Sequence, residues 1–99
     1  MRPTVNSYTV QKTIMRYGEQ MQQTVAMEEC AELIKEISKA IRGQARKEHI
    51  AEEIADVLIC IENIQQIHGI PDEKIQRYID LKTDRILARI NNAKTEMGV

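Results

Sequence analysis

The chain has 99 residues, of which 42% are hydrophobic and 29% charged, and its formal net charge is −1 at pH 7. This length corresponds to one small domain, which buries a modest fraction of its surface. The balanced charge provides no long-range attraction for a nucleic acid polymer or an anionic membrane, so we expect neither partner. With no signal pattern in residues 1–7 and no membrane-spanning apolar run, a cytoplasmic location is expected.

Four helices and no strands are predicted along the chain. Residues 1–7 are expected to form a flexible N-terminal arm, and residues 8–99 a single helical domain. Apolar spacing, together with glycine and proline at the expected ends, predicts helices at 9–17, 19–42, 48–68 and from 71 to 91 or 92. The predicted fold class is therefore all-α, an antiparallel four-helix bundle that is completed by homo-oligomerisation.

The predicted second helix carries an apolar face beside a row of glutamates. Its inner face is expected to consist of Ala26, Cys30, Leu33, Ile37 and Ile41. Glu29 and Glu32 are three residues apart, which places both carboxylates on one side of the helix. Like charges at this spacing destabilise an isolated helix by about 0.2–0.5 kcal/mol per pair, so a ligand that binds both is an attractive explanation. In contrast to this pair, four glutamates are expected simply to face solvent: Glu28, Glu36, Glu52 and Glu62.

The predicted third helix has the seam of a centrally placed helix, and a glutamate is part of that seam. The seam consists of Ile50, Glu53, Val57, Cys60, Ile64 and Ile67. Glu53 and Asp56 repeat the spacing of the first acidic pair, on the next helix along the chain. Cys30 and Cys60 lack CxxC spacing and fall on apolar faces, so both are predicted to be buried, reduced thiols.

The predicted fourth helix contains Lys82 within an otherwise isoleucine-rich seam, with Arg85 one turn further on. A charge on a packed seam is costly unless it has a partner. One interpretation is a buried salt bridge between Glu53 and Lys82. The two acidic pairs favour another: a hard divalent cation with oxygen ligands, bound together with an anionic ligand. His49 and His68 are expected at exposed helix ends, and neither completes a di-iron motif.

The two acidic motifs, in this order, resemble the signature of MazG-like all-α nucleoside triphosphate pyrophosphohydrolases. The first motif reads Glu28-Glu29-Cys30-Ala31-Glu32, and the second, about twenty residues later, reads Glu53-Ile54-Ala55-Asp56. The stretch from Tyr78 to Arg85 is similar to the basic fourth helix of short bacterial and phage members. The resemblance extends from Tyr8 to Ala93, nearly the whole chain.

This resemblance implies a role in nucleotide metabolism: Mg²⁺-dependent cleavage of a (d)NTP between the α and β phosphates, giving (d)NMP and pyrophosphate. It implies that Mg²⁺, or Mn²⁺ in its place, is bound by Glu29, Glu32, Glu53 and Asp56. Either Glu28 or Glu32 is expected to take a proton from the attacking water. The residues implied to bind the triphosphate are Lys82 and Arg85, with Arg89 as the alternative to Arg85. The family likeness further implies a homodimer or a dimer of dimers.

Three other functions remain open from the sequence. Phosphoribosyl-ATP pyrophosphohydrolases have a similar length and similar acidic motifs. The chain also suits a helical interaction module whose glutamates stay solvated, or a degenerate relative that binds nucleotide without hydrolysing it. The only aromatic residues are Tyr8, Tyr17 and Tyr78, and none matches the base-stacking positions of the family, so the base and the sugar are not assigned.

Overall fold

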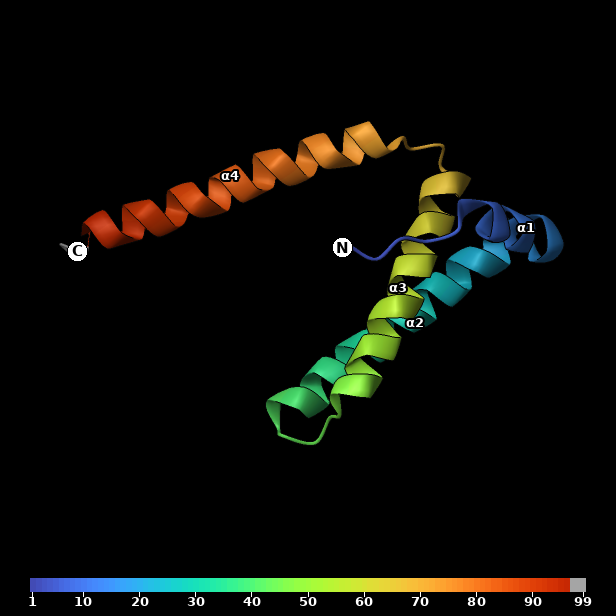
Figure 1. The fold of residues 1–99 in the computed structure, drawn as a ribbon, viewed down its shortest axis with the longest axis horizontal. Coiled ribbons are helices and arrows are strands. Elements are labelled where there is room, and N and C mark those ends of the chain that lie inside the picture. The colour runs from blue at the N-terminus through green and yellow to red at the C-terminus, as the bar shows by residue number, and fades with distance from the viewer. Residues whose placement is uncertain (97–99) are drawn as a thin grey trace. The chain divides into compact units, whose positions relative to one another are not determined.

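The computed structural model describes residues 1–96, and the side chains of residues 1–93. The described residues form four α-helices and no strand, which confirms the predicted all-α class (Figure 1). The helices are α1 (Ser7–Tyr17), α2 (Glu19–Ile41), α3 (Lys47–Ile67) and α4 (Asp72–Glu96). The boundaries of the predicted 8–99 domain stay a prediction, and its last three residues lie outside the described part.

The chain divides into two compact units. The first, Met1–Gly69, contains α1, α2 and α3, which all pack against one another, with the largest interface between α2 and α3. The second begins at Ile70 and contains α4. None of the described helices combines the length and the apolar character that a membrane crossing needs.

The helices α2 and α3 form an antiparallel hairpin (Figure 1). The chain reverses after α2 at Gly43, whose φ of 73° lies in the left-handed region that glycine adopts at low cost. Backbone N–H groups of Gly43 and Gln44 then donate to the carbonyls of Ala40 and Lys39, at 3.0 and 2.8 Å. These bonds satisfy carbonyls at the end of α2. The second half of α2 consequently lies beside the first half of α3.

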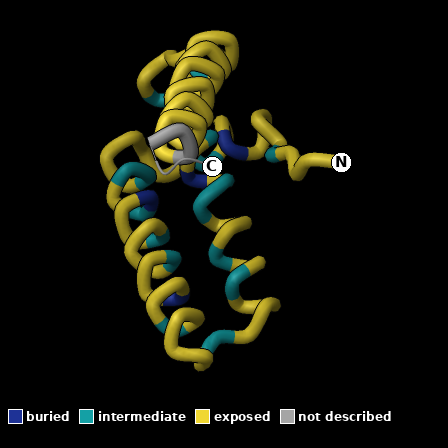
Figure 2. The backbone as a smooth tube through the Cα atoms, turned by 90° about the vertical axis from the view of Figure 1, so that its left-hand side faces the viewer, coloured by how far each residue is buried: buried dark blue, intermediate teal, exposed yellow. Residues whose placement is uncertain are grey.

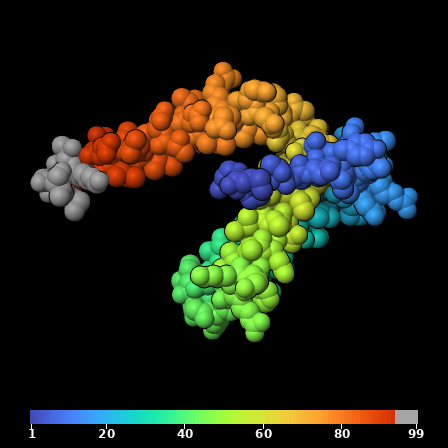
Figure 3. All heavy atoms as spheres, in the orientation of Figure 1, coloured from blue at the N-terminus to red at the C-terminus, as the bar shows by residue number. Residues whose placement is uncertain are grey.

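The helix α1 begins two residues before its predicted start, because Asn6 caps it. The Asn6 side-chain oxygen accepts a hydrogen bond from the Thr9 backbone N–H at 2.9 Å, which satisfies a donor that the first turn leaves free. The helix is held on α3 by a bond from Gln66 Nε2 to the Ser7 carbonyl, at 2.8 Å. The N-terminal segment before α1 runs beside α3 (Figure 3). Together they line an apolar groove whose α3 side includes Ala51, Ile54 and Leu58.

The predicted seam of α3 is confirmed, because every member of it is at least partly buried and Cys60 is only 5% exposed (Figure 2). The predicted inner face of α2 is partly wrong. Ala26 is buried, but Cys30, Ile37 and Ile41 are exposed. Within the first unit α2 packs against α3 and α1. These two helices bury only part of the apolar face that the sequence of α2 predicts. The expectation that Cys30 is a core thiol is therefore incorrect for this structure.

Candidate metal centre

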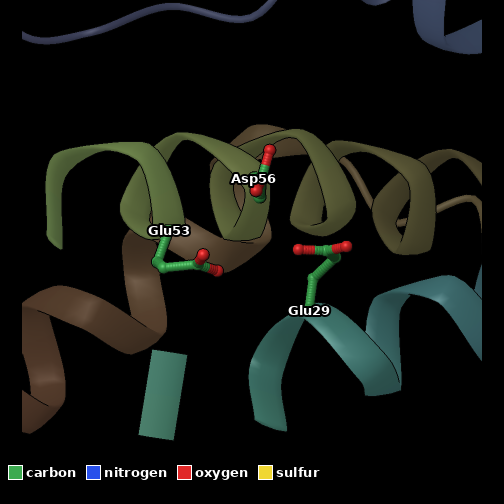
Figure 4. Close-up of side chains that lie close together, drawn as sticks. All are labelled: Glu29, Glu53 and Asp56. Atoms are coloured by element: carbon green, nitrogen blue, oxygen red, sulfur yellow. The ribbon is translucent and has the colours of Figure 1, made fainter. Parts of the chain in front are cut away.

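Three carboxylates from two helices converge between α2 and α3. Glu29 extends from α2 toward Glu53 and Asp56 of α3 (Figure 4). Each offers one oxygen, and these three oxygens lie within 4.8 Å of one another. The hairpin thus brings one member of the first acidic pair, Glu29, to both members of the second pair.

The antiparallel register explains why the acidic motifs meet. Glu29 and Asp56 lie opposite each other, with one oxygen of each within 4.8 Å of the other. Moving one turn toward the connector, the charge of Glu32 acts on Glu53, and one further turn pairs Glu36 with His49. Every forward step on α2 is matched by an equal backward step on α3. The helical spacing of the motifs and the length of the connector together therefore place charged residues in three successive layers of one seam.

Electrostatics within this seam are unfavourable without a cation. Burial raises the pKa of Glu53, and the neighbouring charges of Asp56, Glu32, Glu36 and Glu52 raise it further. The Glu53 Oε2 atom is buried and, among the described residues, accepts no hydrogen bond. A buried carboxylate oxygen in this state is costly unless a proton or a cation compensates it.

Glu29, on α2, has a similarly unfavourable electrostatic environment. Burial raises its pKa first, followed by the interaction with the neighbouring Asp56 carboxyl and the charges of Glu53 and Glu32. A cation bound at this position would supply the charge that compensates these carboxylates.

The donor set fits a hard divalent cation. Mg²⁺ takes oxygen ligands at about 2.1 Å, which corresponds to ligand oxygens about 3 to 4 Å apart in an octahedron. The three oxygens within 4.8 Å need only small side-chain adjustments to reach this geometry. Asp56 is exposed, which leaves one side of the group open to water and to a ligand.

The other predicted acidic residues lie close to this group but are not part of it. Glu32 is exposed, and its charge acts on both Glu29 and Glu53. Glu28 is exposed beside Glu29. The structure therefore brings together three of the four predicted metal ligands directly, with Glu32 next to them.

Glu36 was expected to face solvent, and this expectation is wrong. The residue is 8% exposed, and its two oxygens face Lys39 Nζ at 3.8 Å and His49 Nδ1 at 3.9 Å. The signal available in the sequence was its position one turn beyond Glu32 on the same side of α2. The spacing of the glutamates did not reveal that α3 packs beside Glu36.

Cys60 lies on the other side of the group, toward α1. Burial raises the pKa of its thiol, and the charges of Glu29, Cys30 and Asp56 raise it further, so the thiol stays protonated. Ala26, which is 6% exposed, is also buried on this side. The pocket that Ala26, Cys30 and Ile64 line here has no charged side chain.

The predicted phosphate-binding residues Lys82 and Arg85 lie one turn apart on α4, in the second unit. Their contact with a phosphate stays a prediction.

Comparison with known proteins identifies one family. The model of the MazG nucleotide pyrophosphohydrolase domain matches residues 18–89, which include both acidic motifs and most of α4. No curated protein and no solved structure shows significant similarity to the chain.

Proposed function

We propose that this chain, which belongs to the MazG nucleotide pyrophosphohydrolase family, hydrolyses a nucleoside triphosphate between its α and β phosphates in a Mg²⁺-dependent reaction. The products are a nucleoside monophosphate and pyrophosphate. Family membership supports nucleotide pyrophosphohydrolysis as the reaction class. The convergence of Glu29, Glu53 and Asp56 is the observation that carries the requirement for a divalent cation.

The carboxylates would hold the cation from both helices. Glu53 and Asp56 bind it from α3, and Glu29 and Glu32 from α2. Bound Mg²⁺ supplies Lewis-acid stabilisation of the charge on the phosphates and lowers the pKa of a coordinated water. Occupation of the site would also give the buried Glu53 Oε2 the partner that the described residues do not provide.

The remaining acidic residues would accept the proton of the attacking water. Glu32 is exposed beside the group, so a water molecule that attacks the α phosphorus can pass its proton to this carboxylate. Glu28, the neighbour of Glu29, is the alternative acceptor. Lys82 and Arg85 of α4 are proposed, from the family likeness, to stabilise the leaving pyrophosphate.

A substrate panel tests this function. The purified chain is incubated with Mg²⁺ and each common NTP and dNTP, and with phosphoribosyl-ATP, and the release of pyrophosphate and of phosphate is measured separately. We expect pyrophosphate from at least one nucleoside triphosphate. Release of phosphate alone, or cleavage of phosphoribosyl-ATP alone, would contradict the proposal.

The Glu53→Ala variant tests the site. Hydrolysis should fall to background while circular dichroism shows unchanged helical content, because Glu53 is a ligand and not part of the small apolar core. Glu48→Ala, on an exposed position of the same helix, should retain full activity. Undiminished hydrolysis by Glu53→Ala would remove the assignment.

A further inference from the structure

Glu36 is the one charged residue that is buried in the described part of the chain, and the proposed chemistry does not use it. Its side chain is 10% exposed, and its charge acts on Glu53. A carboxylate in this position adds to the repulsion between the carboxylates of the seam. The burial of Glu36 is therefore unfavourable for the neighbouring carboxylates. This cost suggests that Glu36 has a separate function.

The neighbours of Glu36 are two nitrogen-bearing side chains that reach solvent. Lys39 Nζ and His49 Nδ1 lie 3.8 and 3.9 Å from its two oxygens, and their side chains are 39% and 56% exposed. The buried carboxylate thus sits behind two accessible nitrogen-bearing side chains, one from each helix. The second ring nitrogen of His49, Nε2, has no hydrogen-bond or ion-pair partner within the described residues, so it is available to a ligand.

The two directions along the seam offer an anionic ligand different surroundings. Toward α1, Ala26 and Cys60 are buried, and the pocket that Ala26 and Cys30 line has no charged side chain. Toward the α2–α3 connector, the carboxylates are followed by Glu36, His49 and Lys39. A chain of phosphates whose α phosphate lies at the carboxylates finds no charge partner on the apolar side, where unpaired charge is costly. It can lie over the accessible nitrogen atoms of Lys39 and His49.

We propose that Lys39 and His49 bind the β and γ phosphates of the substrate, and that Glu36 is the positioning residue that holds both groups at this end of the site. The inference rests on the proposed triphosphate hydrolysis and adds an orientation to it, with the phosphate chain directed toward the α2–α3 connector. Charge-assisted hydrogen bonds to phosphate oxygens are among the stronger ones in proteins. Lysine serves as a compact positive charge, and imidazole adds a directional N–H donor.

Binding of inorganic pyrophosphate tests the proposal without requiring turnover. Its affinity for the full chain is measured by isothermal titration calorimetry at a fixed, saturating Mg²⁺ concentration. Lys39→Ala and His49→Gln should each weaken pyrophosphate binding by about tenfold, as expected for loss of one charge-assisted hydrogen bond. In turnover, the same variants should raise KM for the triphosphate with little change in kcat.

Glu36→Gln separates positioning from simple charge repulsion. Removal of a negative charge that only repels phosphate would tighten pyrophosphate binding. If Glu36 holds Lys39 and His49 in place, the variant should instead weaken binding, although it removes a negative charge. Tighter or unchanged binding by Glu36→Gln would overturn the proposal.

Matched controls come from the same chain. Lys12 lies on α1 with its Nζ 4.7 Å from the centre of the Tyr8 ring, and His68, at the end of α3, pairs with Gln23. Lys12→Ala and His68→Gln should leave pyrophosphate affinity unchanged, and these two variants, like Lys39→Ala and His49→Gln, should retain the wild-type affinity for Mn²⁺ alone. An inactive wild-type protein would refute the proposed hydrolysis, whereas active Lys39 and His49 variants with unchanged KM and unchanged pyrophosphate affinity would refute only this inference.

Discussion

At Glu53 and Glu29 the native state without a cation favours protonation, because burial and neighbouring carboxylates raise both pKa values from 4.5. The unfolded chain has no such preference. Above pH 4.5 the folded protein therefore binds more protons than the unfolded one, and its stability falls as the pH rises through the raised pKa values. The direction is opposite to that of a carboxylate in a salt bridge.

This linkage predicts a pH-dependent loss of stability in the metal-free protein. In EDTA, the melting temperature of the wild type should fall more steeply from pH 5 upward than that of a Glu29→Gln/Glu53→Gln variant, which lacks both groups. Thermal unfolding by circular dichroism at several pH values measures the difference. Parallel profiles for the two proteins would show that these carboxylates are not strained.

The substitution Glu53→Gln should separate stability from function. At pH 7 in EDTA its melting temperature should exceed that of the wild type by a few degrees, the range expected for a modest gain in a domain of this size. Mg²⁺ should raise the melting temperature of the wild type by mass action but not that of the variant. Glu48→Gln is the matched control and should respond to Mg²⁺ as the wild type does. A destabilised Glu53→Gln protein would show that the partly buried Glu53 carboxylate is not in an unfavourable environment.

At single positions, burial was predictable where a charged residue interrupted the apolar face of a helix. Glu53 stood out because a glutamate occupied an apolar seam, and it is indeed partly buried against α2. Glu36 was missed because it occupies the polar edge of α2, where spacing alone cannot distinguish solvent from a covering helix. Cys30 was misassigned for the converse reason, since an apolar face in the sequence need not be covered within one chain.

At the scale of elements, the sequence predicted the helices well and their mutual register not at all. Glycine at the helix ends placed the boundaries of α2 and α3 within one residue of those observed. The pairing of Glu29 with Asp56 and of Glu36 with His49 depends on how tightly residues 42–46 turn. That geometry arises from the positive φ of Gly43 and the capping bonds that follow it.

The start of α1 provides an independent test at this scale. Asn6→Ala should lower the free energy of unfolding by about 1 kcal/mol, because the Thr9 N–H loses its capping acceptor. Thr4→Ala, in the exposed segment before the helix, should change it by less than about 0.5 kcal/mol. Urea denaturation measures both. Equal effects would mean that the cap contributes nothing to stability.

At the scale of the whole molecule, the small apolar core limits the stability of a single copy of the chain. In the first unit the buried apolar residues are Val10, Ala26 and Cys60, while large side chains on α2 and α3 stay exposed, among them Ile34, Ile37, Ile54 and Ile61. Exposed apolar surface of this extent is typical of proteins that associate. The predicted homo-oligomer stays a prediction that this observation supports.

Sedimentation equilibrium at micromolar concentration tests the association. The expected mass is at least twice the 11.4 kDa of the chain. A monomer over the whole micromolar range would contradict the prediction and would require the exposed isoleucines to be covered in another way.

We propose that carboxylates from α2 and α3 share one divalent cation. Electron paramagnetic resonance of a Mn²⁺ titration measures this binding, because protein-bound Mn²⁺ loses the sharp signal of the free ion. We predict saturable binding by the wild type, competition by Mg²⁺, and loss of that binding in Glu53→Gln but not in Glu48→Gln. Equal binding by the wild type and Glu53→Gln, or none by either, would contradict the claim.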